Sequence, residues 1–125
     1  SGLSLLVVED DEMTAEALQL ALESEGASVA VAGTIADGLA RFREAALDAV
    51  LSDLRVGDGD GLTLVGEIRR SDGSTGRRTV AVAVTGDDSR ETRAAARAAG
   101  FDETVTKPFA IDALVATVVR LIAAR

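Results

Sequence analysis

Five short apolar runs alternate along this chain with five segments of helical periodicity, and this alternation permits few folds. The apolar runs have the length of β-strands and lie at 3–8, 29–32, 49–54, 79–84 and 103–106. The fourth run lacks alternating polar residues, which is typical of a strand buried on both faces of a parallel sheet. Between the runs, apolar residues recur at helical spacing over 12–24, 34–46, 61–70, 89–99 and 111–124.

Strands and helices in strict alternation predict a three-layer α/β fold, in which a parallel sheet lies between two layers of helices. We expect the flavodoxin-like (βα)5 arrangement, with a five-stranded parallel sheet in the order 2-1-3-4-5 and right-handed crossovers. Thr34, with Asp37 three residues later, resembles a capping box at the start of the second helix. The Gly- and Ser-rich segment 71–78 is predicted to be an exposed, mobile loop.

The composition indicates one domain and excludes several kinds of chemistry. The chain has 125 residues, 47% of them hydrophobic, which is enough for one core. We therefore interpret 1–125 as a single domain, with Ser1-Gly2 as the remnant of a cleaved tag. The chain contains neither Cys nor His, which excludes disulfides, thiolate chemistry, imidazole bases and a phosphohistidine of its own.

The net charge of −8 opposes direct binding to nucleic acid or to an anionic membrane, because both require a positive surface. No apolar run approaches the length needed to span a bilayer, and the chain does not open on a charged and then apolar signal segment. We therefore expect a cytoplasmic protein without membrane insertion, whose partners are proteins or cations.

Polar residues mark the carboxyl ends of four predicted strands. Glu9 and Asp10 follow the first strand, Asp53 ends the third, and Thr85 and Lys107 follow the fourth and fifth. A lone aspartate at a strand end more often caps the next segment. In the predicted strand order, however, these four ends meet at one crevice. Three carboxylates, a hydroxyl and an ammonium are therefore expected to converge.

Such a cluster suits phosphoryl chemistry. Neighbouring carboxylates repel one another, so they take up protons or bind a cation. Ligands that are all oxygen select a hard cation such as Mg²⁺, with Mn²⁺ as the second choice. We expect Asp53 to attack as a carboxylate nucleophile while Lys107 neutralises charge on the phosphoryl oxygens, and Thr85 to donate its hydroxyl to the resulting aspartyl phosphate.

At these residues the sequence resembles the response-regulator receiver domains of two-component signalling, over essentially the whole chain. The Asp53 context at 52–61 is also similar to the receivers of hybrid sensor histidine kinases. The motifs behind the resemblance stand in the family's order and approximate spacing: the acidic run at 7–11, Asp53 with Gly-Asp-Gly-Leu at 59–62, the Thr-Gly pair at 85–86, Gly100, and Thr-Lys-Pro-Phe at 106–109.

The resemblance implies that Asp53 receives a phosphoryl group from the phosphohistidine of a histidine kinase or a histidine phosphotransfer protein, and that this switches the domain's conformation. It also implies Mg²⁺ held by Glu9, Asp10, Asp53 and the backbone carbonyl of Arg55, and a cis peptide bond before Pro108. A domain of this kind catalyses only its own phosphorylation and slow dephosphorylation, so we do not expect an enzyme with turnover.

Three other classes of protein share part of this pattern. A pseudo-receiver would bind partners without being phosphorylated, but all five site positions are retained. A flavin carrier would share the fold, but the first loop is acidic and the chain has no Tyr or Trp. A phosphohydrolase would share the aspartate nucleophile, but its typical Asp-x-Asp in the first strand is absent. The parent protein is left open between a stand-alone receiver, a DNA-binding regulator and a hybrid kinase.

Two positions depart from the family pattern. Thr104 stands where receivers commonly carry Tyr or Phe, which argues against relay through an aromatic side chain. Gly57 stands where many members have Pro, so we expect a looser loop after Asp53. The last helix has a broad apolar stripe that includes Val119, which suits core packing and leaves weak homodimer formation open.

Overall fold

The computed structural model describes residues 2–125, so Ser1 of the predicted tag remnant lies outside the described residues. None of the helices in this range has the length and apolar character that a membrane span requires. The elements in chain order are β1 (Ser4–Val8), α1 (Glu12–Ser24), β2 (Ser28–Ala32), α2 (Ile35–Glu44), β3 (Ala49–Asp53), β4 (Arg55–Val56), β5 (Gly59–Asp60), α3 (Gly61–Thr75), β6 (Val80–Thr85), α4 (Arg90–Ala99), β7 (Glu103–Thr106) and α5 (Ile111–Ala124).

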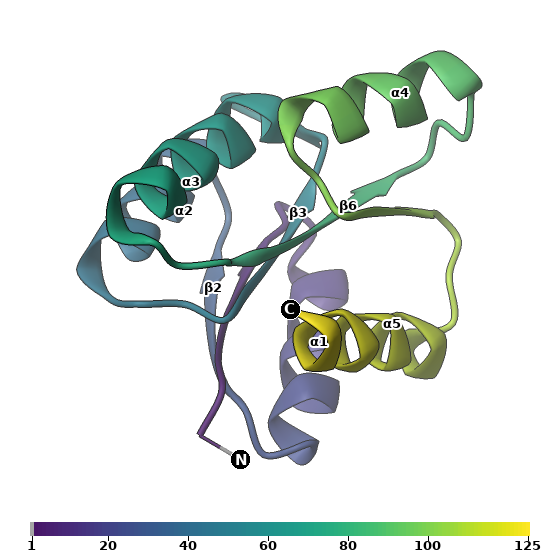
Figure 1. The fold of residues 1–125 in the computed structure, drawn as a ribbon. Helices are drawn as coiled ribbons and strands as arrows, with labels where there is room; N and C mark the ends of the chain where they lie inside the picture. The colour runs from purple at the N-terminus through teal and green to yellow at the C-terminus, as the bar shows by residue number, and fades with distance from the viewer. Residues whose placement is uncertain (1) are drawn as a thin grey trace.

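The main sheet is parallel and has the strand order β2-β1-β3-β6-β7. Helices α1 and α5 cover one face, and α2, α3 and α4 cover the other (Figure 1). This confirms the predicted three-layer fold and its 2-1-3-4-5 order, once the two short strands β4 and β5 are set apart. Because all pairs are parallel, the strands that matter for the site end at the same edge of the sheet.

The core fills both sides of the sheet, which explains why the strand sequences are apolar without alternation. Leu5 and Val7 of β1 belong to the cluster that packs against α1 and α5, whereas Leu6 and Val8 belong to the cluster under α2 and α3. None of these four side chains is more than 3% exposed. A third cluster fills the space under α3 and α4.

Side-chain caps begin four of the helices. Asp11, Thr34, Asp60 and Ser89 each accept a hydrogen bond from the backbone N–H three residues later, at the starts of α1, α2, α3 and α4. The predicted cap at Thr34 is confirmed, with 3.0 Å between its Oγ1 and the Asp37 nitrogen. The helices that flank the site therefore begin at defined residues.

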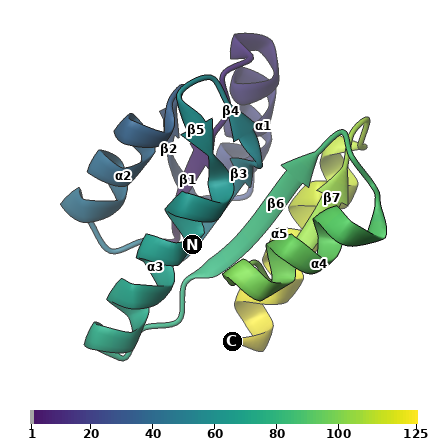
Figure 2. The ribbon, with the colours of Figure 1, turned by 90° about the horizontal axis from the view of Figure 1, so that it is seen from above.

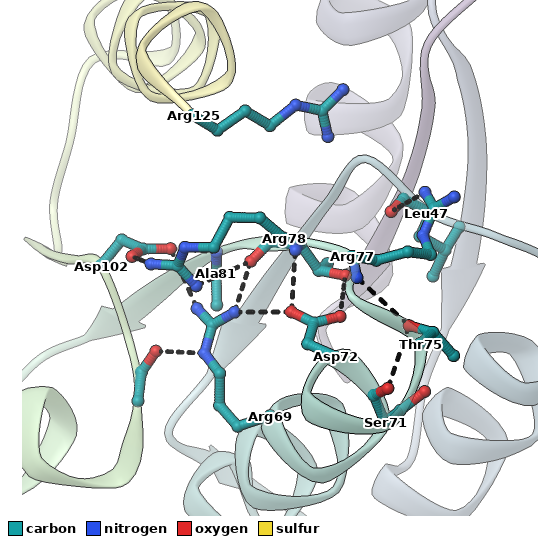
Figure 3. Close-up of polar contacts among 12 residues, drawn as sticks. Leu47, Arg69, Ser71, Asp72, Thr75, Arg77, Arg78, Ala81, Asp102 and Arg125 are labelled. Carbon is teal, nitrogen blue, oxygen red and sulfur yellow. Dashed lines mark hydrogen bonds and ion pairs between the residues drawn. The ribbon is translucent and has the colours of Figure 1, made fainter.

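Helix α3 is longer than predicted: the expected loop at 71–78 was wrong for 71–75, which are helical. The Asp72 carboxylate accepts hydrogen bonds from the N–H and the hydroxyl of Thr79, at 2.8 and 2.9 Å, and pairs with Arg69 at 3.0 Å (Figure 3). These bonds offset the weak helix propensity of the Ser, Asp and Gly residues there. Gly76, with φ of 77°, then ends the helix in the left-handed conformation.

The glycine-rich segment after Asp53 also differs from the expected loop. It folds into a small antiparallel hairpin, in which Arg55 pairs with Asp60 and Val56 pairs with Gly59. The Val56 side chain is only 5% exposed and packs in the cluster under α2 and α3. Alternating apolar residues, the usual signal of a hairpin, are absent from so short a segment.

Candidate functional site

The predicted site residues come from the carboxyl ends of adjacent strands. Glu9 directly follows β1, Asp53 and Thr85 are the last residues of β3 and β6, and Lys107 directly follows β7. In Figure 2 these strands lie side by side. Their parallel register pairs Asp53 with Val84 and Thr85 with the residue before Lys107, so the strands deliver their polar residues to one edge.

Three carboxylates meet at this edge. Glu9, Asp10 and Asp53 each offer an oxygen atom, and these oxygens all lie within 4.8 Å of one another. Glu9 and Asp53 are buried, at 4% and 7% exposure, whereas Asp10 is exposed. The Glu9 carboxylate also accepts a hydrogen bond of 3.1 Å from the Asp11 N–H, which orients it. Two carboxylates of the cluster are thus buried, and the third is open to solvent.

Lys107 closes the other side of the cluster. Its Nζ donates to Asp53 Oδ2 at 2.9 Å and to Glu9 Oε1 at 3.1 Å. Its backbone N–H donates to the Thr85 carbonyl at 2.7 Å, which holds the residue after β7 against the end of β6. The peptide bond between Lys107 and Pro108 is cis, as the family resemblance implied.

One ammonium does not balance these carboxylates, and their pKa values reflect this. Burial raises the pKa of Asp53 to about 6. The neighbouring Glu9 also raises this pKa, whereas the ammonium of Lys107 lowers it. Burial acts the same way on Glu9, but hydrogen bonds with Asp53, the Asp11 N–H and Lys107 outweigh it and lower the pKa of Glu9. Burial opposes the charge on Lys107, yet its two carboxylate partners raise the pKa of Lys107. The site therefore carries excess negative charge that a cation would relieve.

Thr85 lies at the same edge but is engaged by a different partner. Its hydroxyl accepts a hydrogen bond of 3.1 Å from the Asp87 N–H, and the residue is 8% exposed. The Asp87 carboxylate in turn accepts from the Thr92 hydroxyl at 2.6 Å, in the first turn of α4. Thr85 is therefore linked through the β6–α4 loop to the start of α4.

Thr104, where an aromatic was missing, is covered by an arginine that sequence reasoning did not place there. Arg93 of α4 donates to the Thr104 carbonyl at 3.3 Å and to the Thr106 hydroxyl at 2.8 Å. The arginine thus joins α4 to β7 at Thr104 and Thr106. The helical spacing of Arg93 with Arg90 and Arg97 places the three on one face of α4 but does not show these partners.

Two residues of the segment after Asp53 make close contacts that sequence reasoning did not predict. Gly61 lies so close to Asp53 that a Cβ there would sit 2.6 Å from the Asp53 carbonyl oxygen. Asp58 accepts hydrogen bonds from the Ile35 and Ala36 N–H groups, at 2.7 and 3.1 Å. The run of alternating Gly and Asp signalled a turn, but only the fold shows what each residue contacts.

With the fold and geometry established, comparison with known proteins gives the family. The family model described as the response regulator receiver domain matches residues 5–119. The chain belongs to this family. Receiver domains are components of two-component signalling systems, so the predicted class is confirmed.

Individual relatives of this receiver domain agree with the assignment. A 14.6 kDa protein of Leptolyngbya boryana is 34% identical over 106 residues, which cover 85% of this chain and 79% of that protein. The transcriptional regulatory protein PmrA of Pectobacterium parmentieri is 34% identical over 120 residues, which cover 96% of this chain and 52% of PmrA. The chain thus spans about half the length of the transcriptional regulators it matches.

A solved structure of the same kind superposes over nearly the whole molecule. The CheY-like receiver domain protein of Methanospirillum hungatei has a TM-score of 0.89 at 25% sequence identity, covering 99% of this receiver domain and 96% of that chain. The similarity includes all five strands and five helices of the predicted (βα)5 fold, because so little of either chain is left out.

Proposed function

We propose that this receiver domain is a phosphoacceptor, in which Asp53 takes a phosphoryl group from the phosphohistidine of a histidine kinase or histidine phosphotransfer protein. The observation that carries the proposal is the position of Asp53, a buried carboxylate between two further acids and the ammonium of Lys107. Such a group has the charge to bind a cation and the partner to neutralise an incoming phosphate. The encounter would take place in the cytoplasm.

The acidic cluster fits a hard divalent cation. Its donors are carboxylate oxygens within 4.8 Å of one another, with no His or Cys in the chain to favour a softer metal. In this proposal Mg²⁺, or Mn²⁺ in its place, would be held by Glu9, Asp10, Asp53 and the backbone carbonyl of Arg55. The bound ion would supply positive charge to the phosphoryl oxygens.

The chain's own residues would carry the rest of the reaction. As the phosphorus–nitrogen bond of the phosphohistidine breaks, a bond forms between phosphorus and a carboxylate oxygen of Asp53. The imidazole nitrogen keeps the electron pair and takes up a proton. Lys107, already 2.9 Å from Asp53, would stabilise the phosphoryl charge. The burial of Asp53 would keep attacking water away from the product.

The switch would begin at Thr85. To donate its hydroxyl to a phosphoryl oxygen the Thr85 side chain would turn toward the phosphoryl group, and the Asp87 N–H that now donates to the same oxygen would have to follow; Asp87 is in turn joined to the first turn of α4. Phosphorylation would therefore bias the position of the β6–α4 loop. Phosphorylation can shift the equilibrium between two conformations of the loop only as far as it stabilises one conformation more than the other.

The domain by itself would be a signalling component without turnover. Its net charge of −8 argues against direct binding to nucleic acid. Several relatives of the domain are transcriptional regulators, and the chain spans about half the length of each. This similarity favours a transcriptional regulator over a hybrid kinase as the parent protein.

The decisive experiment is intact-protein mass spectrometry after incubation with Mg²⁺ and acetyl phosphate. We expect a gain of one phosphoryl group in the wild type and in Glu44→Gln, whose exposed side chain lies at the end of α2. We expect no gain in Asp53→Asn or after chelation of Mg²⁺. No gain in the wild type, repeated with a panel of phosphorylated histidine kinases, would leave a pseudo-receiver that acts by binding alone.

A further inference from the structure

The hairpin that follows Asp53 is tied to a helix that contributes no predicted ligand to the site. Asp58, at the turn between β4 and β5, accepts hydrogen bonds from the Ile35 N–H at 2.7 Å and the Ala36 N–H at 3.1 Å. These are the first two N–H groups of α2, and Thr34 satisfies the third through Asp37. The first turn of α2 is therefore capped by two residues: Asp58 from a turn that is distant in sequence, and Thr34 from the helix's own N-cap position.

The same turn passes the acidic cluster. A Cβ at Gly57 would lie 4.0 Å from Asp10 Oδ2, and Arg55, two residues earlier, supplies the carbonyl assigned to the metal. The turn also lies close to α2, since a Cβ placed at Gly59 would be 3.6 Å from Cγ1 of Ile35. The turn therefore lies beside Asp10 at Gly57 and is anchored to α2 at Asp58.

Gly57 explains why an anchor from outside the turn matters. Glycine restricts the backbone less than any other residue, so the turn has no stiffness of its own at the position nearest Asp10. Two hydrogen bonds to a carboxylate across 22 and 23 positions of sequence supply a restraint from outside the turn. The positive end of the α2 dipole adds to the attraction.

We propose that Asp58 is a positioning residue of this site, which holds the Arg55 carbonyl and the Gly57 backbone beside the carboxylates by tying the β4–β5 turn to the first turn of α2. The inference rests on the proposed function, because it assigns Asp58 a part in binding the cation. Asp58 itself does not touch the ion or the phosphoryl group. Its removal would leave every proposed ligand in the chain and loosen the loop that carries one of them.

The test compares Asp58→Ala and Asp58→Asn with two matched controls. Thr34→Ala removes the other cap of the same helix without touching the hairpin. Asp37→Asn removes one exposed acidic charge from the same turn of α2, which controls for the loss of charge at Asp58. Mg²⁺ affinity is measured by isothermal titration calorimetry, and amide hydrogen exchange is measured in the metal-free protein.

We expect Asp58→Ala to weaken Mg²⁺ binding by about three- to tenfold, less than the full contribution of the two lost hydrogen bonds, because the loop can still become ordered when the ion binds. Asp58→Asn, which keeps one acceptor oxygen, should fall between this variant and the wild type. Amide exchange at Ile35 and Ala36 should become faster without metal, and phosphorylation of Asp58→Ala should recover at saturating Mg²⁺. Thr34→Ala and Asp37→Asn should bind Mg²⁺ as the wild type does.

Two results would overturn this role for Asp58 while leaving the phosphoacceptor function intact. One is wild-type Mg²⁺ affinity in Asp58→Ala. The other is equal weakening in Thr34→Ala, which would mean that the stability of α2 alone matters. A wild-type protein that neither binds Mg²⁺ nor gains phosphoryl mass would reject both the function and the positioning role.

Discussion

Lys107 Nζ lies 2.9 Å from Asp53 Oδ2, although the two residues are 54 positions apart in the chain. The contact exists because β3 and β7 end at the same edge of a parallel sheet, on either side of β6. Lys107 shares its charge between Asp53 and Glu9, so it partly neutralises both without balancing the cluster. The acceptor carboxylate is thereby kept close to the group expected to receive the phosphoryl charge.

Replacement of Lys107 should slow phosphorylation. We expect Lys107→Ala to reduce the rate of phosphoryl gain from acetyl phosphate by about 100-fold, since one half-buried charge that stabilises the transferring group is lost. Lys107→Arg keeps the charge in a different shape and should lose less. The rates are measured by intact mass at fixed Mg²⁺, and wild-type kinetics in Lys107→Ala would contradict the role given to this ammonium.

The stability of the metal-free domain should depend on pH through Asp53. The pKa of Asp53 is about 6 in the folded domain, above the ordinary value of 3.8, so the folded state binds this proton more tightly than the unfolded state. The ionised carboxylate therefore destabilises the fold progressively as pH rises from about 4 to about 6, and fully above that range.

Asp53→Asn removes this cost. We expect the variant to be more stable than the wild type by roughly 1–3 kcal/mol at neutral pH without Mg²⁺, with the difference shrinking as the pH falls from about 6 to about 4. Urea denaturation at several pH values measures it. Glu44→Gln is the control for loss of one acidic charge. A difference that does not change with pH would show that Asp53 is not destabilised by ionisation.

Arg69 should be important for stability while lying far from the site. Its guanidinium donates to the Gly100 and Thr79 carbonyls and pairs with Asp72 and Asp102, so it joins α3 to the segments that precede β6 and β7 (Figure 3). We expect Arg69→Met to lower the free energy of unfolding by about 2–4 kcal/mol, because two largely buried carboxylates lose a partner.

The adjacent arginine is the matched control for this prediction. Arg70 pairs with Glu67 at the surface, where its side chain is 74% exposed. Arg70→Met should change the free energy of unfolding by less than about 1 kcal/mol. Urea denaturation compares the two variants. Similar values for both would mean that the buried network contributes no more than a surface ion pair.

Gly61 should tolerate no side chain. A Cβ there would lie 2.6 Å from the Asp53 carbonyl oxygen and 3.1 Å from the Ser52 hydroxyl. Gly61→Ala is therefore expected to lower the free energy of unfolding by about 1–3 kcal/mol, since backbone at the acceptor must shift. Phosphorylation should slow as well, which intact mass would detect.

Gly66 in the same helix provides the contrast. A Cβ there would meet nothing within 4 Å, so Gly66→Ala should raise the free energy of unfolding by up to about 1 kcal/mol through helix propensity alone. Thermal denaturation of the two alanine variants measures the difference. Equal effects at the two glycines would show that the contact with Asp53 imposes no constraint.

The sequence alone was sufficient to predict the layers of the fold and the residues gathered at the site. Each strand is short, apolar and followed by a helix, and parallel pairing then leaves little freedom in where the strand ends lie. Glu9, Asp53 and Lys107 could be predicted to meet because each stands directly at such an end. The periodicity of apolar residues predicts each strand and helix, and the alternation of strands and helices predicts the strand order.

Tertiary structure decided the features that depend on distant partners. Helix α3 continues through a segment of weak helix formers because Asp72 finds Thr79 and Arg69. The turn at Asp58 is anchored because the first N–H groups of α2 face it. Neither pairing follows from local propensity, since a hydrogen bond across the fold depends on where two backbones come to lie once the sheet and helices have packed.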